Sequence, residues 1–340
     1  MDHYIYLMTG FILLIGGSEI LIRGSVNIAS IFKVSPFLIG VVIVAGGTSL
    51  PELAACLQAI NLGVEDIVIG NIVGSNIANI LLIIGAVAIV NPIIGEKNVY
   101  QKPDTSFSLV HKIYFHVGKN KSDFAAILTS VFFIYCCLKG VITFLEGILM
   151  LISLGIFIFI IFSKEQRQLD QQESKNIPLW LAIVFLIGGL IGLIKGSGLF
   201  ISGASGIAHS FGVSTTIIGI TVVALGTSLP ELTTGLMAAF KKQTDFAIGN
   251  ILGSNIYNVL GILGISSMLQ DLTIPVNLSR KITIKEMGIN LSLPSITYDA
   301  FFILVITLLF VYLLRKRKII GRKMGVFFIA IYALYILILI

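Results

Sequence analysis

The hexapeptide Gly-Thr-Ser-Leu-Pro-Glu occurs twice in this chain, and each copy lies inside a long apolar run. The first copy ends at Glu52 and the second at Glu231. A carboxylate at membrane depth is energetically expensive and indicates a functional site by default. A proline in a spanning helix removes a backbone donor and clashes with the preceding turn. The combination, repeated at one spacing, predicts a site to which both hexapeptides contribute.

The two hexapeptides belong to a longer internal repeat with a constant offset of 179 residues. The same offset relates Asp66 to Asp245, and the tetrapeptide Gly-Ser-Asn-Ile occurs in both copies. The best-matched regions are 45–79 and 224–258. Identity at this density indicates a duplication, so we expect a structure of two related halves.

The composition is that of a membrane protein. Only 12% of the 340 residues are charged, and the mean hydropathy is +1.00, which is too apolar for a soluble domain. A spanning helix needs about 20 mainly apolar residues. Ten segments approach this length: 4–22, 36–61, 67–91, 125–142, 145–163, 178–203, 213–239, 246–268, 300–314 and 324–340. We therefore predict an all-α membrane protein with ten transmembrane helices.

The basic residues indicate the orientation of these spans. With the N-terminus outside, most Lys and Arg residues fall in inner loops, which is the positive-inside pattern. Topology thus explains the net charge of +6 without nucleic-acid binding. Each half holds an odd number of spans, so the second half must be inverted. We predict two inverted-topology five-helix repeats, 1–163 and 177–340, a short cytoplasmic linker at 164–176, and both termini outside.

The prolines and their neighbours supply oxygen atoms at membrane depth. Pro51 cannot donate to the carbonyl of Gly47, nor Pro230 to that of Gly226, and such carbonyls must face protein or a water-filled cavity. The nearby polar side chains are Thr48, Ser49, Ser75 and Asn79 in the first half, and Thr227, Ser228, Ser254 and Asn258 in the second. Oxygen ligands with two carboxylates favour Ca²⁺, Na⁺ or Mg²⁺. For a single Ser or Thr, a role in helix packing is the alternative.

The paired sequences GTSLPE with GNIVGSNIAN, and GTSLPE with GNILGSNIYN, resemble the α1 and α2 repeats of the cation/calcium exchanger superfamily. The closest resemblance is to its prokaryotic sodium/calcium antiporters, and it extends over essentially the whole chain. It implies that Glu52 and Glu231 bind Ca²⁺ at mid-membrane, with Thr48 and Thr227 as backbone ligands. It also implies Na⁺ sites built from Ser49, Ser75, Ser228, Ser254 and the carbonyls of Ala45 and Ala224.

One position departs from the pattern of some archaeal sodium/calcium exchangers, which carry Asp where this chain has Asn258, opposite an Asn where it has Asn79. The site then holds two carboxylates rather than three, which leaves the counter-ion open. The leading hypothesis is a secondary active antiporter that exchanges Ca²⁺ for Na⁺ by alternating access. The alternatives are a proton-coupled Ca²⁺/H⁺ antiporter, whose two carboxyl groups carry the protons, and a passive cation channel.

The remaining expectations concern partners and location. We expect the lipid bilayer and inorganic cations as partners, no cofactor, no nucleic acid and no obligate protein partner. No nucleophile–base pair, phosphate-binding loop or HExxH motif appears, so an enzyme is not expected. The overall plan is typical of a prokaryotic plasma-membrane protein. Long loops are expected at about 95–124 and 269–299, without an assigned role.

Overall fold

The computed structural model describes residues 2–64, 66–94, 109–165, 177–212, 224–274, 279–284, 289–315 and 319–339. Its main elements are helices, three of which (η1, η2 and η4) are π-helical segments. The first half contains α1 (Asp2–Ile31), α2 (Pro36–Ile39), η1 (Gly40–Val44), α3 (Ala45–Thr48), α4 (Leu50–Asn61), α5 (Asp66–Ala78), η2 (Asn79–Ile83), α6 (Ile84–Val90), α7 (Leu109–Lys139) and α8 (Phe144–Glu165). The second half contains α9 (Leu179–Ser210), α11 (Ala224–Thr227), α12 (Leu229–Phe240), α13 (Thr244–Ile256), η4 (Tyr257–Leu263), α14 (Gly264–Leu269), α15 (Ser295–Arg315) and α16 (Arg322–Leu339).

Eight helical segments among the described residues are long and apolar enough to cross a membrane. They are Asp2–Ile31, Pro36–Asn61, Asp66–Val90, Ser122–Lys139, Phe144–Ser163, Leu179–Ser210, Thr244–Leu269 and Ile296–Leu314. Each overlaps one of the ten predicted spans. Of the other two predictions, 213–239 begins outside the described residues, and 324–340 falls mostly on helix α16. The helical membrane fold is therefore confirmed, whereas the count of ten stays a prediction.

The two predicted long loops contain regular structure that the prediction missed. Helix α7 begins at Leu109, so part of 95–124 is helical. The range 269–299 contains β3 (Leu272–Thr273) and the hairpin of β4 (Ser279–Ile284) and β5 (Ile289–Pro294). The loop predictions rested on hydropathy, which falls where a chain leaves the bilayer. Helical and strand hydrogen bonds do not depend on hydropathy, so these elements continue beyond the apolar segments.

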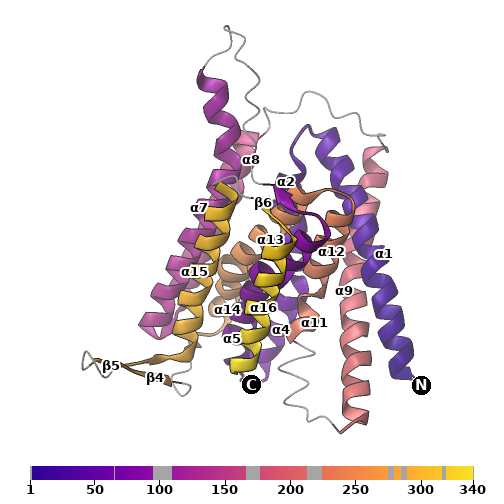
Figure 1. The fold of residues 1–340 in the computed structure, drawn as a ribbon. Helices are drawn as coiled ribbons and strands as arrows, with labels where there is room; N and C mark the ends of the chain where they lie inside the picture. The colour runs from indigo at the N-terminus through magenta and orange to yellow at the C-terminus, as the bar shows by residue number, and fades with distance from the viewer. Residues whose placement is uncertain are drawn as a thin grey trace.

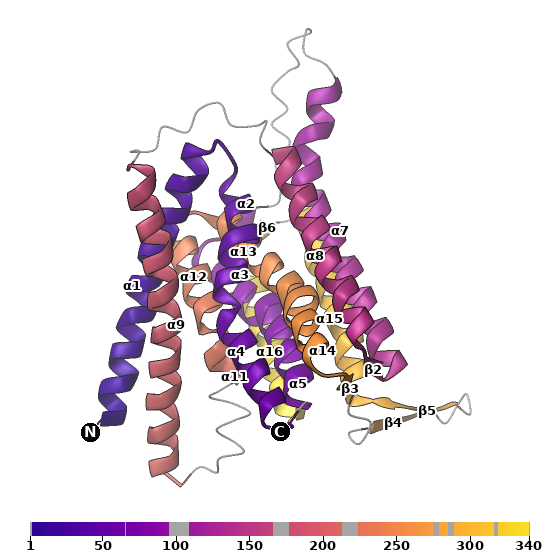
Figure 2. The same cartoon turned by 180° about the vertical axis from the view of Figure 1, so that it is seen from behind.

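Elements around the two motifs recur at the offset seen in the sequence. Helices α3 and α11 match residue for residue at this offset, as do α4 and α12. Short strands join the halves: β1 (Ile93–Ile94) pairs with β6 (Ile319–Ile320), and β2 (Val141–Ile142) pairs with β3. Figure 2 shows β6 in the upper part of the molecule and β2 and β3 toward the lower end. The equivalent ribbons thus lie toward opposite ends, as inverted repeats require.

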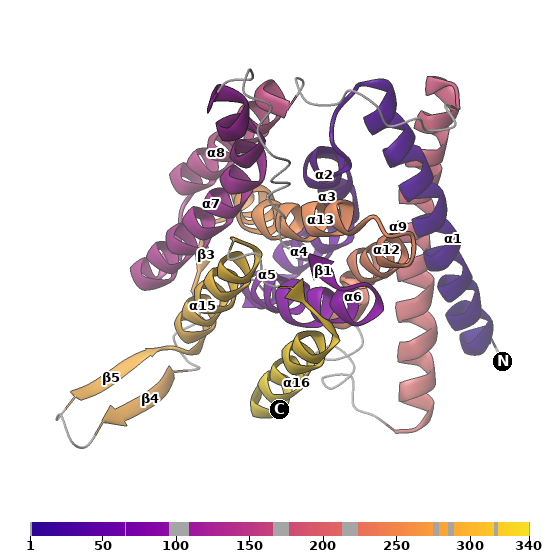
Figure 3. The same cartoon turned by 45° about the horizontal axis from the view of Figure 1, so that its top comes forward.

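The helices that carry the repeated motifs lie in the middle of the molecule. Figures 1 and 2 show α1 and α9 side by side at one edge, and α7, α8 and α15 at the other. In Figure 3, α16 lies beside α6, and the two helices are in contact. In the central span Thr244–Leu269, 94% of the hydrophobic stretch is buried, against 33% in Asp2–Ile31. The second motif is therefore shielded from lipid by the outer helices.

Helices α1 and α9 run antiparallel and approach each other closely along glycines. A Cβ atom on Gly10 would lie 2.4 Å from the backbone nitrogen of Phe200, and one on Gly24 would lie 2.6 Å from that of Leu186. Small residues allow this approach, which is a common way to associate helices in lipid, where the hydrophobic effect gives no driving force between them. The pair forms one rigid edge of the molecule.

Replacing Gly189 by Ala is expected to destabilise this helix pair. A Cβ atom there would lie 2.6 Å from the backbone nitrogen of Leu21, which cannot move independently of its helix. Overpacking of this kind costs about 1–3 kcal/mol, and the melting temperature in detergent measures it. The adjacent Gly188 is exposed and has no atom within 4 Å of an added Cβ, so Gly188→Ala is the matched control. Equal melting temperatures for the two variants would contradict the packing argument.

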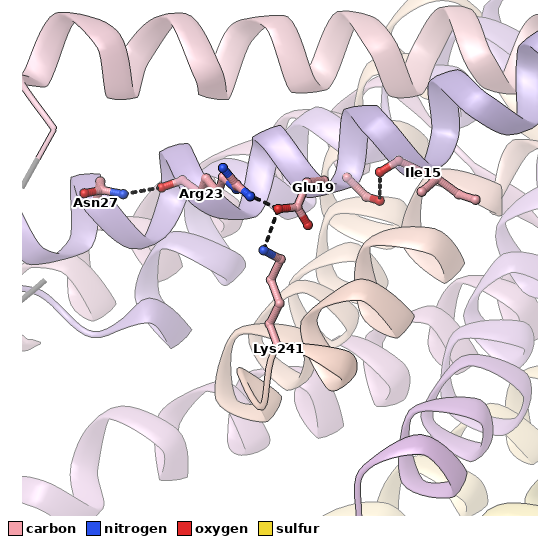
Figure 4. Close-up of polar contacts among 6 residues, drawn as sticks. Ile15, Glu19, Arg23, Asn27 and Lys241 are labelled. Atoms are coloured by element: carbon pink, nitrogen blue, oxygen red, sulfur yellow. Dashed lines mark hydrogen bonds and ion pairs between the residues drawn. The ribbon is translucent and has the colours of Figure 1, made fainter. Parts of the chain in front are cut away.

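An ion-pair cluster connects α1 to the end of α12. Glu19 Oε1 accepts hydrogen bonds from Arg23 Nε at 2.6 Å and from Lys241 Nζ at 2.7 Å (Figure 4). Arg23 lies one turn away on the same helix, whereas Lys241 follows the last residue of α12. The cluster ties the outer helix pair to a motif helix of the second repeat.

Candidate cation-binding site

Each hexapeptide interrupts a helix at its serine. Helix α3 ends at Thr48 and α4 begins at Leu50, with Ser49 between them at φ −82° and ψ 4°. In the second repeat, Ser228 takes φ −86° and ψ 6° between α11 and α12. Pro51 and Pro230 occupy the first turn of the following helices, where proline needs no hydrogen-bond acceptor. The break places Ser49 and Ser228 directly before the helices that carry Glu52 and Glu231.

The two carboxylates are fully buried and are bound by serines of both repeats. Glu52 Oε1 accepts hydrogen bonds from Ser75 at 3.5 Å and from Ser228 at 3.2 Å. Glu52 is 0% exposed. One of these serines comes from the same repeat as Glu52, and the other from the opposite repeat.

The second carboxylate has the equivalent environment. Glu231, 1% exposed, accepts hydrogen bonds at Oε1 from Ser254 and from Ser49, both at 3.4 Å. The two arrangements are related by the offset of the repeat, and Ser75 also lies 3.1 Å from Ser228. Each carboxylate and its two serines thus form a group that crosses the boundary between the halves. The two groups together are called the carboxylate cluster.

Four oxygen atoms of this cluster and of two neighbouring asparagines have no hydrogen-bond partner among the described residues. They are Oε2 of Glu52, Oε2 of Glu231, Oδ1 of Asn79 and Oδ1 of Asn258. Buried polar atoms are nearly always paired, so unpaired ones require an explanation. Carboxylate and amide oxygens are pure acceptors, which a hard cation satisfies as a Lewis acid. The donor set therefore fits Ca²⁺ or Na⁺ as transported cargo.

A layer of four asparagines adjoins the carboxylates. Asn79 Nδ2 donates to Asn255 Oδ1 at 2.8 Å, and Asn258 Nδ2 donates to Asn76 Oδ1 at 3.0 Å. Asn79 begins η2, and Asn258 lies in η4; wide π-turns of this kind are frequent at functional sites. The sequence interpretation assigned no role to Asn76 and Asn255. Their identity at the offset of the repeat was the signal that could have found them.

The contacts of the motif threonines and carbonyls are less alike in the two repeats than those of the serines. Thr48 Oγ1 donates to the carbonyl of Ala45 and to Asn250 Oδ1, both at 3.4 Å. Thr227 is buried, and Ala224 begins α11. The carbonyl of Ala45 also accepts the backbone N–H of Ser49 at 3.1 Å. Thr48 and Thr227 are thus the last residues of α3 and α11, directly before the serines of the carboxylate cluster.

One of the carbonyls left without a helical donor by the prolines has a protein partner. Pro230 cannot donate to the carbonyl of Gly226, which instead accepts a hydrogen bond from Ser197 Oγ at 2.7 Å. Ser197 comes from α9, a helix that the sequence interpretation did not connect with the motif. The Gly226 carbonyl thus faces protein, which is one of the two surroundings expected for a carbonyl without a helical donor.

The chemistry of the cluster is uniform. It contains carboxylate, hydroxyl and amide groups, and within the described residues no group of three or more His, Cys, Asp or Glu side chains converges. All three cysteines are buried and unpaired with each other. Such a set lacks the soft ligands that favour zinc or copper. Its formal charge with both carboxyl groups ionised is −2, from Glu52 and Glu231.

Fold and site together define an integral membrane protein with a buried all-oxygen site between two inverted repeats. The family model described as sodium/calcium exchanger protein matches residues 3–163 and 181–340. The chain belongs to this family, which confirms the resemblance to the cation/calcium exchangers inferred from the motifs.

Individual relatives match over most of their length. An uncharacterized membrane protein of Methanocaldococcus jannaschii is 33% identical over 334 residues, which cover 97% of this chain and 96% of the relative. The sodium/calcium exchanger MaX1 of Methanosarcina acetivorans is 29% identical over 80% of this chain and 84% of its own length. A solved structure of the sodium-calcium exchanger NCX_Mj has a TM-score of 0.78 and 31% identity, with 100% of this chain and 99% of that chain covered. The similarity thus includes both repeats.

Proposed function

We propose that this protein is a secondary active antiporter that exchanges Ca²⁺ for Na⁺ across the membrane. The observation that carries the proposal is the cluster of two buried carboxylates with four unpaired oxygen atoms, shared between inverted repeats. Inverted repeats build transporters that expose a midplane site alternately to each side. Membership of the sodium/calcium exchanger family supports Na⁺ and Ca²⁺ as the two exchanged ions.

We assign the ligands by their charge and place. Glu52 and Glu231 hold Ca²⁺ at the centre, assisted by Thr48 and Thr227. The surrounding Na⁺ sites use the remaining hydroxyl and carbonyl oxygens, namely those of Ser49, Ser75, Ser228, Ser254, Ala45 and Ala224. Asn79 and Asn258 each contribute a neutral amide oxygen to the site. Because the two sets share the carboxylates, Na⁺ and Ca²⁺ compete, and this competition couples their fluxes.

The domain plan and location follow the same proposal. We assign 1–163 and 177–340 to the two repeats and 164–176 to a cytoplasmic linker. The protein lies in a prokaryotic plasma membrane with both termini outside, and it requires neither a cofactor nor a protein partner. It is a transporter and catalyses no covalent step.

An imposed Na⁺ gradient is expected to drive the uptake of radioactive calcium into vesicles that contain the purified protein. Exchange of one Ca²⁺ for more than two Na⁺ moves net charge, so a membrane-potential dye should respond during uptake. The same vesicles without a gradient, and empty vesicles, are the controls.

Three other outcomes would each replace the proposal. Uptake that ignores Na⁺, follows a pH gradient and leaves the dye silent would identify a Ca²⁺/H⁺ antiporter, in which both carboxyl groups carry protons. Flux that persists without any counter-ion would identify a passive channel. Absence of Ca²⁺ transport under all conditions would contradict an exchanger of this ion.

A further inference from the structure

We propose that Asn76 and Asn255 are positioning residues of the cation site. They hold the amide nitrogens of Asn258 and Asn79, so that the side-chain oxygens of these two residues are presented to the transported cations. The inference rests on the proposed Ca²⁺ site, but it concerns residues that do not themselves bind the ion.

The orientation of the Asn79 amide follows from hydrogen-bond chemistry. Asn255 Nδ2 lies 3.4 Å from the backbone carbonyl of Asn76, which can only accept. This contact places the nitrogen of Asn255 toward the carbonyl and its Oδ1 toward Asn79. Asn79 must then present its own nitrogen, at 2.8 Å. Because nitrogen and oxygen share one carbon, Asn79 Oδ1 is directed away from this contact, and it has no partner in the described part of the chain.

The equivalent contact holds the other asparagine. Asn258 Nδ2 donates to Asn76 Oδ1 at 3.0 Å and to Ser75 Oγ at 3.1 Å. Its Oδ1 is likewise buried without a partner among the described residues. Ser75 also donates to Glu52, so the amide of Asn258 is tied directly to the carboxylate cluster. Each of these two asparagine–asparagine hydrogen bonds joins one repeat to the other. Each leaves one neutral amide oxygen for the cation.

Asn76 and Asn255 themselves line a cavity that is separate from the carboxylates and serines of the site. Both line a cavity of about 10 Å³, together with the hydroxyl-bearing residues Thr129, Ser130 and Thr307 of α7 and α15. The cavity has room for about one water molecule. Neither carboxylate and none of the four serines of the site lines it. The two residues therefore act on the cation through Asn79 and Asn258.

The test measures Ca²⁺ affinity of the purified full-length protein by isothermal titration calorimetry. Asn255→Leu keeps the volume but removes the acceptor, so the Asn79 amide can turn its nitrogen toward the cation. We expect the Kd for Ca²⁺ to rise about 10-fold, the value of one hydrogen-bonded ligand. In an Asn79→Asp background, where oxygen occupies both arms of the side chain, Asn255→Leu should change the Kd less than about twofold.

The matched control is the asparagine on the other side. In an Asn258→Asp background, Asn255→Leu should still raise the Kd for Ca²⁺ about 10-fold, because Asn79 still depends on its hydrogen bond to Asn255. If Asn255→Leu does not purify as a monodisperse protein, the equivalent substitution in the other repeat, Asn76→Leu, is tested in the same backgrounds. Asn76→Leu should then be relieved by Asn258→Asp and not by Asn79→Asp.

The outcomes separate this inference from the function on which it rests. An equal loss of affinity in all three backgrounds would show that Asn255 supports the structure in general, and would overturn the positioning role. No loss in any background would overturn it as well. Wild-type protein that does not bind Ca²⁺ would overturn the proposed function, and the positioning role with it.

Discussion

Replacing either Glu52 or Glu231 by Gln is expected to weaken Ca²⁺ binding by about 100-fold or more and to abolish Na⁺-driven Ca²⁺ uptake. The substitution keeps the shape of the side chain but removes half of the site's negative charge. Loss of one partner from a buried charge pair costs about 3–5 kcal/mol, and about 1.4 kcal/mol corresponds to a tenfold change in Kd. Calorimetry in detergent gives the Kd, and tracer uptake into vesicles gives the transport rate.

The two variants should lose similar amounts, because the hydrogen bonds around the carboxylates are equivalent. Each carboxylate is bound by one serine from each repeat. Glu19→Gln is the matched control: it makes the same chemical change at a partly exposed carboxylate that pairs with Arg23 and Lys241, and it should alter the Kd less than about twofold. A Glu52→Gln or Glu231→Gln protein that binds Ca²⁺ within threefold of the wild type would show that the cation lies elsewhere.

The duplication explains how much of the site could be predicted from the sequence. A constant offset between two motifs, together with an odd number of spans in each half, implies a pseudo-twofold relation between them. The crossed contacts of Ser49 with Glu231 and of Ser228 with Glu52 are what such a relation produces. The helix break at each serine could likewise be predicted from the sequence, because Pro51 and Pro230 interrupt the hydrogen bonding of a helix.

The same duplication explains what the sequence could not reveal. Ser18 and Ser197 are equivalent residues of α1 and α9, yet their hydroxyls have different partners. Ser197 donates to the carbonyl of Gly226 in another helix, whereas Ser18 donates to the carbonyl of Ile15 in its own helix at 2.9 Å. Identical residues therefore make different contacts in the two repeats. The repeat in the sequence therefore does not predict which partner each of these hydroxyls has.

The asparagine layer was missed for a related reason. Asn76 and Asn255 stood out as repeated residues, but an amide can pack, cap or bind a cation. Only the contacts distinguish these roles, since they show which end of each amide is held. Sequence spacing placed Asn79 one turn from Ser75, and the structure adds the residue of the opposite repeat that orients it.

Replacing Gly253 by Ala is expected to reduce both stability and Ca²⁺ affinity, because α13 approaches the backbone of the first repeat closely at this glycine. A Cβ atom on Gly253 would lie 2.6 Å from Cβ of Ala45 and 2.8 Å from the carbonyl oxygen of Val41. Relief requires that α13 move away from η1 and α3, carrying Ser254 and the second motif with it. The expected cost is about 1–3 kcal/mol of stability, seen as a lower melting temperature in detergent.

The effect on Ca²⁺ binding follows from how the ligands are shared. Each carboxylate depends on a serine of the opposite repeat at 3.2–3.4 Å, and a shift of a few tenths of an ångström lengthens such bonds beyond hydrogen-bonding distance. We expect the Kd to rise about 10-fold, the equivalent of one lost hydrogen-bonded ligand. Gly261→Ala is the matched control, since its added Cβ would first meet a flexible leucine side chain, Leu154, at 3.4 Å. If Gly253→Ala lowered the melting temperature but left Ca²⁺ affinity unchanged, the close approach of the repeats would stabilise the fold without determining the geometry of the site.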